Sequence, residues 1–506
     1  MDERSPDCLV IRGGLVLRSS AHEAAALDIL VQGGRITELG QPGMPAPAQA
    51  REIDARGRLL HAGLVNAHTH GHGAYAKAMG DRWTLELLLN AGPWINGSRT
   101  QEDLYLSAVL NAAEMVLKGC TACYDLYSQA PAPTAEGMRT VAKAYGDVGM
   151  RALIAPMVAD RSLYDTVPGL VEALPEDLRA YAGSLRPQSY DATLAALRDF
   201  LAEGRVGPLV RAALAPTIPQ LCSDEFLRAC RDCAADLDLR LHSHIAESRL
   251  QAVAGCERHG GTIVAHLDRL GLLSERLTMA HAVWLTEDDM IRAAARGASV
   301  AHNPASNMRL GSGIADVRGM LEHGVTVGLG ADGSNSSDNQ NMYEAMRLAS
   351  FSSKVRTPRF ETWLTTREAF HAATEGGARC LGMDGELGRL EVGYQADIVF
   401  LDLDHINWIP LNDPVNQLVH TEDATAVDSV LVGGRFVVRG RQLVNVDLPG
   451  VAKKVALARA RLAELTEDKR LMAERLGRIV GPFCADFACC RPYPVDRYGY
   501  RDGSCA

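Results

Sequence analysis

Four histidines and two acids are spaced like side chains that hold a metal ion and move protons beside it. His68 and His70 form an H-x-H at the end of the apolar run VNAHTH. On a strand, residues i and i+2 point to the same face, so both imidazoles can bind one ion. His72 continues the alternation, but it lies between Gly71 and Gly73. We therefore expect His72 past the strand end and not among the ligands.

A second segment, LHSHIAES, places Glu247 three residues after His244. At this distance from a ligand at a strand end, a carboxylate supplies an acid or base next to the metal without binding it. His242 lies two residues before His244 and faces the same way, so either histidine can be the ligand. The spacing to Glu247 favours His244.

Two further apolar runs each contain one polar residue that can do chemistry. His281 stands in MAHAVWL and Asp332 in VGLGADG. Alone, His281 fits a buried core histidine, and Asp332 fits a turn or helix-cap aspartate. Barrel enzymes, however, keep their catalytic groups at the C-terminal ends of their strands. The order His-x-His, His, His and Asp, each at the end of a predicted strand, is therefore more specific than any of its parts.

Strands and helices alternate between residues 62 and 384. Apolar runs such as RALIAPMV, LTMAHAVWL and VTVGLGADG are separated by helical stretches such as DEFLRACRDCAADLD. This alternation predicts an α/β fold with a parallel sheet. About eight such units over about 320 residues favour a (β/α)8, TIM-like barrel, which would be the catalytic part.

Short strands broken by glycine turns flank this barrel on both sides in the sequence. Residues 1–61 alternate apolar and polar positions, and the same texture returns in residues 385–446, for example in VDSVLVGGRFVV. We predict that the two segments form one split β-sandwich domain. Residues 447–506 predict one long amphipathic helix followed, from Gly481, by a tail that contains cysteines.

The composition is that of a soluble globular protein. Hydrophobic residues make up 47% of the 506, and the formal net charge is -10. An acidic chain without a block of Lys and Arg has no electrostatic footprint for nucleic acid or an anionic membrane. The sequence shows no signal peptide and no apolar run of the ~18 residues that a membrane span needs, so we expect a cytoplasmic protein.

The twelve cysteines follow no disulfide framework. We therefore expect reduced thiols. Cys120 and Cys123 form a C-x-x-C, but no second pair matches it as a zinc site requires. We interpret this pair as part of a buried strand. The cysteines near the C-terminus have a spacing that fits no standard metal site.

Five motifs together resemble the amidohydrolase superfamily, namely VNAHTHGHG, HSHIAES, AHAVWL, AHNPASNMRLGSG and GLGADGSNSSDNQNMYEAMRLAS. The branch that they resemble most contains the aminohydrolases of triazines, of guanine, and of S-adenosylhomocysteine or methylthioadenosine. The likeness covers roughly residues 8 to 445. It includes GELGRLEVGYQADIVFLDLD, which is similar to that branch's return to its second domain.

The resemblance implies a role for each candidate residue. The implied metal ligands are His68, His70, His244 and Asp332. Glu247 matches the proton shuttle, His281 matches a histidine beside the metal-bound water, and Asp332 would take the proton of that water. The implied reaction is attack of metal-bound hydroxide on a ring carbon with release of ammonia.

The resemblance also implies the kind of metal centre. We expect one divalent ion, zinc from its nitrogen and oxygen ligands, with Fe²⁺ or Mn²⁺ as alternatives. Family members with two metals carry a bridging lysine on the fourth strand. The matching run GPLVRAALAP contains Arg211 and no lysine.

The substrate side departs from the members that deaminate nucleosides. Those carry a Pro-x-Glu whose Glu holds the ribose, where residues 93–96 read PWIN. We therefore expect a small planar N-heterocycle of purine, pterin, triazine or pyrimidine type. Trp83, Gln220 and Asn303 are the candidate substrate contacts. Ordinary packing on a helix is an equal alternative for Trp83.

Other functions remain open. Hydrolytic ring-opening of a cyclic amide and dechlorination of a heterocycle use the same hydroxide attack, and only ammonia release separates them from deamination. A non-catalytic barrel that serves as a binding protein predicts lost ligands, whereas the complete set is present. The long C-terminal helix offers a face for another subunit, so we expect a homo-oligomer.

Overall fold

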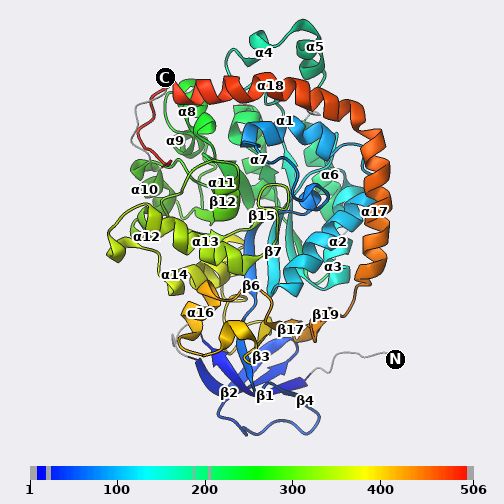
Figure 1. Ribbon diagram of the computed structural model, residues 1–506, viewed down its shortest axis with the longest axis vertical. Coiled ribbons are helices and arrows are strands. Elements are labelled where there is room, and N and C mark those ends of the chain that lie inside the picture. Colours follow the sequence, from blue (N-terminus) through cyan, green and yellow to red (C-terminus); the bar gives the residue numbers. More distant parts are fainter. Residues whose placement is uncertain (1–7, 19–23, 186, 188–189, 203–206, 499–506) are drawn as a thin grey trace.

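The computed structural model describes residues 8–18, 24–185, 187, 190–202 and 207–498, and Figure 1 shows the arrangement of its elements. A barrel of parallel strands fills the centre. The barrel strands are β6 (Leu64–His70), β7 (Cys120–Tyr127), β8 (Arg151–Val158), β9 (Val210–Ala212), β10 (Ala215–Pro216), β11 (Leu241–Ile245), β12 (Leu277–His281), β13 (Ser299–His302), β14 (Thr326–Leu329) and β15 (Asp332–Gly333).

These strands form two parallel sheets that meet on both sides. One has the order β10-β8-β7-β6-β15 with β9 on β8, and the other has the order β11-β12-β13-β14. A bridge between Leu214 and Leu241 joins them on one side. On the other side β14 pairs with β13, while β15, which follows β14 along the chain, pairs with β6. The predicted (β/α)8 barrel is confirmed.

Helices alternate with the strands and surround them. They are α1 (Leu85–Ile95), α2 (Gln101–Leu117), α3 (Ala135–Val148), α4 (Leu170–Ala173), α5 (Glu176–Ser184), α6 (Tyr190–Ala202), α7 (Asp224–Asp236), α8 (Arg249–His259), α9 (Ile263–Arg269), α10 (Glu287–Ala295), α11 (Pro304–Arg309), α12 (Val317–Glu322), α13 (Met342–Val355), α14 (Thr366–His371) and α15 (Gly377–Cys380). Many begin at a side-chain cap. Thr286, for example, accepts a hydrogen bond from Asp289 N, and the Asp289 carboxylate accepts one from Thr286 N. Such a reciprocal cap satisfies two backbone donors and fixes where the helix starts.

A second sheet combines strands from both ends of the chain. Its strands are β1 (Cys8–Leu17), β2 (Ala24–Gln32), β3 (Arg35–Gly40), β4 (Arg51–Asp54), β5 (Arg58–Ala62), β16 (Ile398–Asp402), β17 (Val427–Val432), β18 (Arg435–Arg439) and β19 (Gln442–Leu443). Strand β5 pairs with β1 on one side and with β16 on the other. All nine are hydrogen-bonded into one continuous sheet around a buried apolar cluster that includes Ile11, Ile29 and Leu60. Helix α16 (Pro414–His420) lies between β16 and β17 in the chain.

Polar contacts tie this sheet to the barrel. Arg151 on β8 and Asp397 form a two-pronged ion pair, with Nε to Oδ2 at 2.9 Å and Nη2 to Oδ1 at 3.1 Å. Their side chains are 12% and 4% exposed, so the pair is shielded from solvent. His61 on β5 lies 2.8 Å through Nε2 from the Tyr343 hydroxyl of α13.

The C-terminal segment differs from the expected single helix and tail. It forms two helices, α17 (Leu448–Leu465) and α18 (Glu467–Cys489), which run along one side of the barrel and across its top in Figure 1. The break falls at Thr466, whose hydroxyl and backbone N–H both donate to Leu462 O, a pattern that often bends helices. Because α18 continues past Gly481, Cys484 and Cys489 are helical and not part of a tail. Cys505 lies outside the described residues.

The buried cysteines of the described residues carry free thiols. Cys120 and Cys123 lie buried on β7, and burial raises the pKa of Cys120 to about 12. This agrees with a core position for the C-x-x-C pair. Within the described part of the chain, no helix is long and apolar enough to cross a membrane.

Candidate active site

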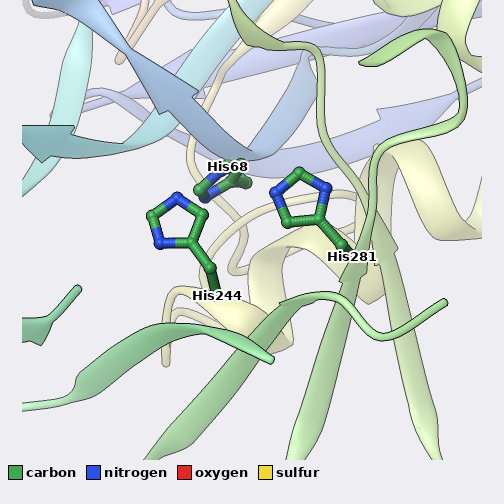
Figure 2. A group of neighbouring side chains, drawn as sticks. All are labelled: His68, His244 and His281. Carbon is green, nitrogen blue, oxygen red and sulfur yellow. The ribbon is translucent and has the colours of Figure 1, made fainter. Parts of the chain in front are cut away.

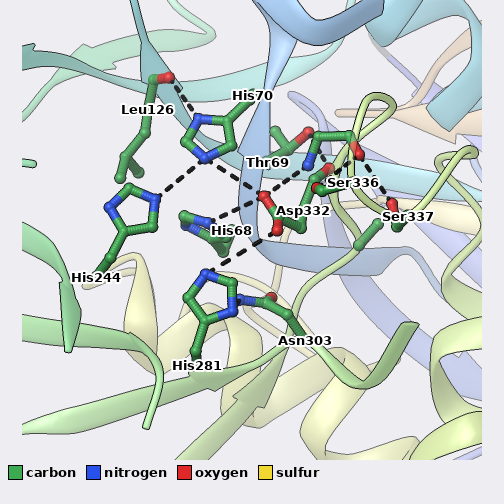
Figure 3. A network of polar contacts seen from close by, with 12 residues as sticks. His68, Thr69, His70, Leu126, His244, His281, Asn303, Asp332, Ser336 and Ser337 are labelled. Carbon is green, nitrogen blue, oxygen red and sulfur yellow. Dashed lines mark hydrogen bonds and ion pairs between the residues drawn. The ribbon is translucent and has the colours of Figure 1, made fainter. Parts of the chain in front are cut away.

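The barrel brings the predicted chemical residues to one mouth. His68 and His70 stand at the end of β6, His244 on β11, His281 at the end of β12, and Asp332 at the start of β15. Since the strands are parallel, their C-terminal ends meet at the same face of the barrel. Figure 2 shows the rings of His68, His244 and His281 turned toward a common point, and Figure 3 adds His70 and Asp332.

Donor atoms at this point lie as close together as the ligands of one ion. Nε2 of His70 is 3.1 Å from Nε2 of His244 and 3.3 Å from Oδ1 of Asp332. Oδ1 of Asp332 is also 3.4 Å from Nε2 of His68, a buried nitrogen without a hydrogen-bond partner in the described part of the chain. Zinc binds imidazole nitrogen at ~2.0–2.1 Å, which spaces neighbouring ligands at about these separations. Three nitrogens and one carboxylate oxygen therefore fit a divalent ion.

Backbone carbonyls fix the orientation of two rings. Nδ1 of His70 lies 2.9 Å from Leu126 O, and Nδ1 of His244 lies 2.5 Å from Thr217 O (Figure 3 shows the first). A ring that donates through Nδ1 keeps the lone pair of Nε2 for a metal. Burial lowers the pKa of His244 well below its usual value, so this ring is neutral, as a ligand must be.

Asp332 is held in an unusual backbone conformation. Its φ is +58°, in the left-handed region where residues other than glycine are rare. Its carbonyl accepts hydrogen bonds from Gln340 Nε2 at 2.6 Å and from Thr69 Oγ1 at 3.2 Å. Burial opposes its ionisation, but interaction with His68 and the neighbouring histidines holds the pKa of Asp332 well below its usual range. The side chain is therefore a fixed anion aimed at the cluster.

Glu247 and His281 lie beside the cluster, and their contacts with it are longer than those among the four proposed ligands. Nε2 of His281 is 3.5 Å from Oε2 of Glu247 and 4.0 Å from Oδ2 of Asp332. Glu247 is 1% exposed, and its Oε2 has no hydrogen-bond partner among the described residues. Burial, followed by the charge of Asp332, raises the pKa of Glu247 well above its usual value. The surroundings of Glu247 therefore favour its protonated form.

Two asparagines contact Nδ1 of His281, the ring nitrogen that points away from the acids. Nδ1 of His281 lies 2.9 Å from Oδ1 of Asn307 and 3.3 Å from Nδ2 of Asn303. The shorter contact joins a donor to an acceptor when the ring proton sits on Nδ1. Asn307 therefore leaves Nε2 as the unprotonated nitrogen on the side of Glu247 and Asp332.

A cavity of about 780 Å³ opens from this cluster. His70, His244, Glu247, His281 and Asp332 line its inner end. Further lining comes from α1, the segment after β7, β8 and the first turn of α18. These residues include Leu88, Leu89, Pro93, Asn96, Gln129, Pro131, Met157, Thr217 and Lys469. Apolar wall residues of this kind can pack against the flat faces of a ring.

None of the three predicted substrate contacts is among the residues that line this cavity. Trp83 packs edge to face on Trp94, with ring centroids 6.1 Å apart. Gln220 donates to Gln251 O at 2.8 Å and lies behind the wall. Asn303 is fully buried and reaches the site only through His281.

Two further histidines, His72 and His242, lie near the cluster. His72 lies in the 3-10 turn after β6, past the strand end as predicted, and lines the cavity. His242 is fully buried beneath the cluster, with its ring against Tyr124 at a centroid distance of 4.4 Å. The ring nitrogens of His242 are not among the grouped ligand atoms, whereas a ring nitrogen of His244 is.

Some lining residues carried no sequence signal. Lys469 lies in an ordinary amphipathic stretch, and only the path of α18 brings it to the cavity, where its Nζ lies 3.2 Å from Ser98 Oγ. Thr217 occupies the fourth-strand loop, and its carbonyl holds His244. Spacing along the chain contains no information on either contact.

The fold and the site are those of a barrel enzyme with a His/Asp cluster that can hold a metal. The model of the amidohydrolase family matches residues 59–437, and the chain belongs to this family.

Similar proteins include several deaminases. A 5-methylthioadenosine/S-adenosylhomocysteine deaminase of Desulforamulus reducens is 31% identical over 90% of this chain and 99% of its own. A 5'-deoxyadenosine deaminase of Methanothermobacter thermautotrophicus is 32% identical over 87% of this chain and 95% of its own.

Two solved structures share the fold and contain zinc. An adenosine deaminase from Xanthomonas campestris with bound zinc has a TM-score of 0.79 at 28% identity, covering 90% of this chain and 98% of that one. An atrazine chlorohydrolase from Arthrobacter aurescens complexed with zinc has a TM-score of 0.80 at 28% identity, covering 89% of this chain and 100% of that one.

Proposed function

We propose that this protein is a hydrolase with one divalent metal, zinc by preference, that removes an amino group from an N-heterocycle as ammonia. The single observation that carries the proposal is the grouping of buried imidazoles and the Asp332 carboxylate beside the buried carboxyl group of Glu247. The proposed ligands are His68, His70, His244 and Asp332. When bound, such an ion supplies the Lewis acidity that makes water nucleophilic near neutral pH.

The chain's own residues supply the proton transfers. Asp332 is anionic, and its Oδ2, on the side of His281, can accept a proton. Glu247 carries a proton on a buried carboxyl group and can donate it to a ring nitrogen as the new C–O bond forms. The resulting Glu247 carboxylate can then take the hydroxyl proton of the adduct and pass it to the amine as the C–N bond breaks. The proton that Asp332 accepted from water returns Glu247 to its starting state. The amine must leave as NH₃, because an amide anion is too poor a leaving group. Nε2 of His281 lies between the two acids and can orient the attacking water.

The relatives' names indicate adenine-type rings, whereas residues 93–96 lack the glutamate expected for a ribose contact. Asn96 lines the cavity at this point. A side-chain amide binds a hydroxyl pair less strongly than a carboxylate does. We therefore propose a free or lightly substituted amino-heterocycle as the substrate, and we treat nucleosides as an outcome of the test.

The test is ammonia release by the Zn²⁺-loaded protein across aminopurines, their 5'-deoxynucleosides, aminopterins, aminotriazines and aminopyrimidines. The Glu247→Gln variant is the control, because it keeps the shape of the site and loses the acid. Ammonia from one ring class, lost in the control, supports the proposal. A silent panel with metal bound one to one would rule out deamination. Chloride release from a chlorotriazine would then favour the dechlorination that one structural neighbour's name suggests.

The proposal includes a cytoplasmic homo-oligomer. The free thiols favour a reducing compartment. Leu457 and Leu465 of α17 and Leu471 of α18 are 74%, 57% and 45% exposed, so these helices carry apolar side chains that another subunit could cover. Light scattering should give a mass above that of one chain for the wild type and a smaller mass for Leu457→Glu. A wild-type mass of 54.5 kDa would reject the oligomer.

A further inference from the structure

The last described stretch of the chain, residues 488–498, lies across the loops that leave the barrel strands. We call this stretch the C-terminal clasp. Figure 1 shows it as the red end of the chain beside α8. Arg249, two residues after Glu247, donates through Nε to Ala488 O at 2.9 Å and through Nη2 to Arg491 O at 3.0 Å. The clasp therefore contacts the loop that carries the proposed proton donor.

The clasp also contacts the loops after β12 and β13. The Tyr493 hydroxyl donates to Trp284 O at 2.8 Å, and the Trp284 indole donates to Ser312 O at 2.8 Å. In the β13 loop, Ile314 N donates to Arg497 O at 2.8 Å. One segment thus links the loops that carry Glu247, His281 and the two asparagines.

Arg497 makes the most buried of these contacts. The residue is only 8% exposed, although it is charged. Its Nε donates to Val283 O at 3.0 Å and its Nη2 donates to Leu285 O at 2.7 Å. Its Nη1 lies 3.5 Å from the Asp316 carboxylate, which balances part of the charge. Hydrogen bonds from a charged donor are stronger than neutral ones, so the two carbonyls are firmly held.

The carbonyls that Arg497 binds come directly after two residues with a strained backbone. His281 and Ala282 have φ of +68° and +51°, in the left-handed region that L residues avoid. Such conformations persist only where the surroundings hold the chain on both sides. Ala282 N donates to Ile245 O at 3.1 Å on the near side, and Arg497 holds the carbonyls of Val283 and Leu285 on the far side.

This conformation determines where the imidazole of His281 points. It directs Nε2 toward Glu247 and Asp332 (Figure 3 shows the contact with Asp332). A relaxed backbone would turn the ring away from both acids while leaving the four proposed ligands in place. A misplacement of about 1 Å by a distant mutation can cost about 10²-fold in rate.

We propose that Arg497 is a positioning residue for the reaction, because its bonds to Val283 O and Leu285 O hold His281 in the left-handed conformation that aims its ring at the site. The inference rests on the proposed function only in that His281 takes part in catalysis. The structural part of the inference is independent of the substrate.

The test compares Arg497→Ala and Arg497→Lys with wild type as full-length, Zn²⁺-loaded proteins, on the panel compound that releases ammonia fastest. Arg497→Ala should lower kcat by about 10- to 100-fold with KM within about 2-fold and metal content unchanged. Arg497→Lys keeps the charge but cannot bridge two carbonyls, so it should lose less. The matched control is Arg475→Ala, which removes an exposed ion pair with Asp177 elsewhere on the C-terminal helices and should match wild type.

A double mutant separates positioning from general loss of stability. In the His281→Ala background, Arg497→Ala should cause no further loss of kcat, because the ring that it positions is already absent. An equal loss in both backgrounds, or wild-type kcat in Arg497→Ala, would overturn the inference. A crystal structure of Arg497→Ala, which removes both bonds to the carbonyls, supplies a readout that needs no substrate. An unchanged φ at His281 would reject the mechanism even if the panel were silent.

Discussion

Replacing Asn307 with leucine removes the acceptor that fixes the proton of His281. Oδ1 of Asn307 lies 2.9 Å from Nδ1 of His281, a ring that is only 1% exposed, so water cannot take its place. The other neighbour of Nδ1 is the donor Nδ2 of Asn303 at 3.3 Å. The tautomer with the proton on Nε2 is therefore the more stable one in the variant. That change turns the nitrogen facing Glu247 and Asp332 from an acceptor into a donor.

The structure sets the size of this effect. Leaving a buried donor without its acceptor costs about 1–3 kcal/mol. In the variant this free energy adds to the activation barrier, because the ring must first adopt the tautomer with its proton on Nδ1. Each 1.36 kcal/mol lowers the rate by a factor of about ten. We expect kcat to fall by about 5- to 150-fold, with KM nearly unchanged because Asn307 does not line the cavity.

The assay is steady-state ammonia release on the best panel compound, with metal content measured in the same samples. Ser306→Ala is the matched control, since its buried hydroxyl has no hydrogen-bond partner among the described residues and lies one position away. The control should stay within about 2-fold of wild type. An Asn307→Leu enzyme with wild-type kcat, or with a loss confined to KM, would refute a role for Asn307 in setting the tautomer.

Three further predictions concern the proton donor, acid stability and the contact between sheet and barrel. Glu247→Gln should lower kcat by about 10²- to 10⁴-fold at unchanged metal content; loss of metal in the same samples would instead make Glu247 a ligand. Burial lowers the pKa of His61 to about 4 from 6.5. Between these two pH values the imidazole is protonated in the unfolded chain and neutral in the folded one. The stability from this group is complete above about pH 6.5 and falls by about 1.4 kcal/mol per pH unit toward pH 4, and urea titrations at pH 7 and 5 should show a smaller acid loss for His61→Gln than for wild type. Asp397→Ala leaves the buried Arg151 without a carboxylate, with only Gln395 Oε1 still bonded to it, and should lower the free energy of unfolding by about 3–5 kcal/mol. Arg56→Ala, at an exposed pair, should leave the unfolding midpoint unchanged, and equal midpoints for the two variants would contradict the larger effect expected for the buried pair.

The cluster was predictable because strand geometry determines it. The two-residue spacing of His68 and His70 survives folding unchanged, since alternate side chains of a strand share a face. His244, His281 and Asp332 were predictable for a related reason, as parallel strands bring all their C-terminal ends to one mouth. In each case a local pattern defines a global position.

The remaining features depend on contacts that leave no local pattern. Trp83 is equally compatible with a ring-stacking position and with packing, and only the path of its loop turns it toward Trp94. Lys469 reaches the cavity because α18 breaks from α17 at Thr466, whose hydroxyl donates to Leu462 O. Arg497 binds backbone carbonyls, and carbonyls are the same at every position of the chain.

The sheet built from both ends of the chain has a consequence for synthesis. Strand β5 ends at Ala62, but its partner β16 begins only at Ile398. At about 10 residues per second, one edge of β5 waits on the order of half a minute for that partner while the chain emerges from the ribosome. An unpaired edge offers backbone hydrogen bonds to any other strand, including that of a neighbouring nascent chain. The first strands of this protein therefore need protection, by a chaperone or by the emerging barrel helices, until nearly the whole chain has been translated.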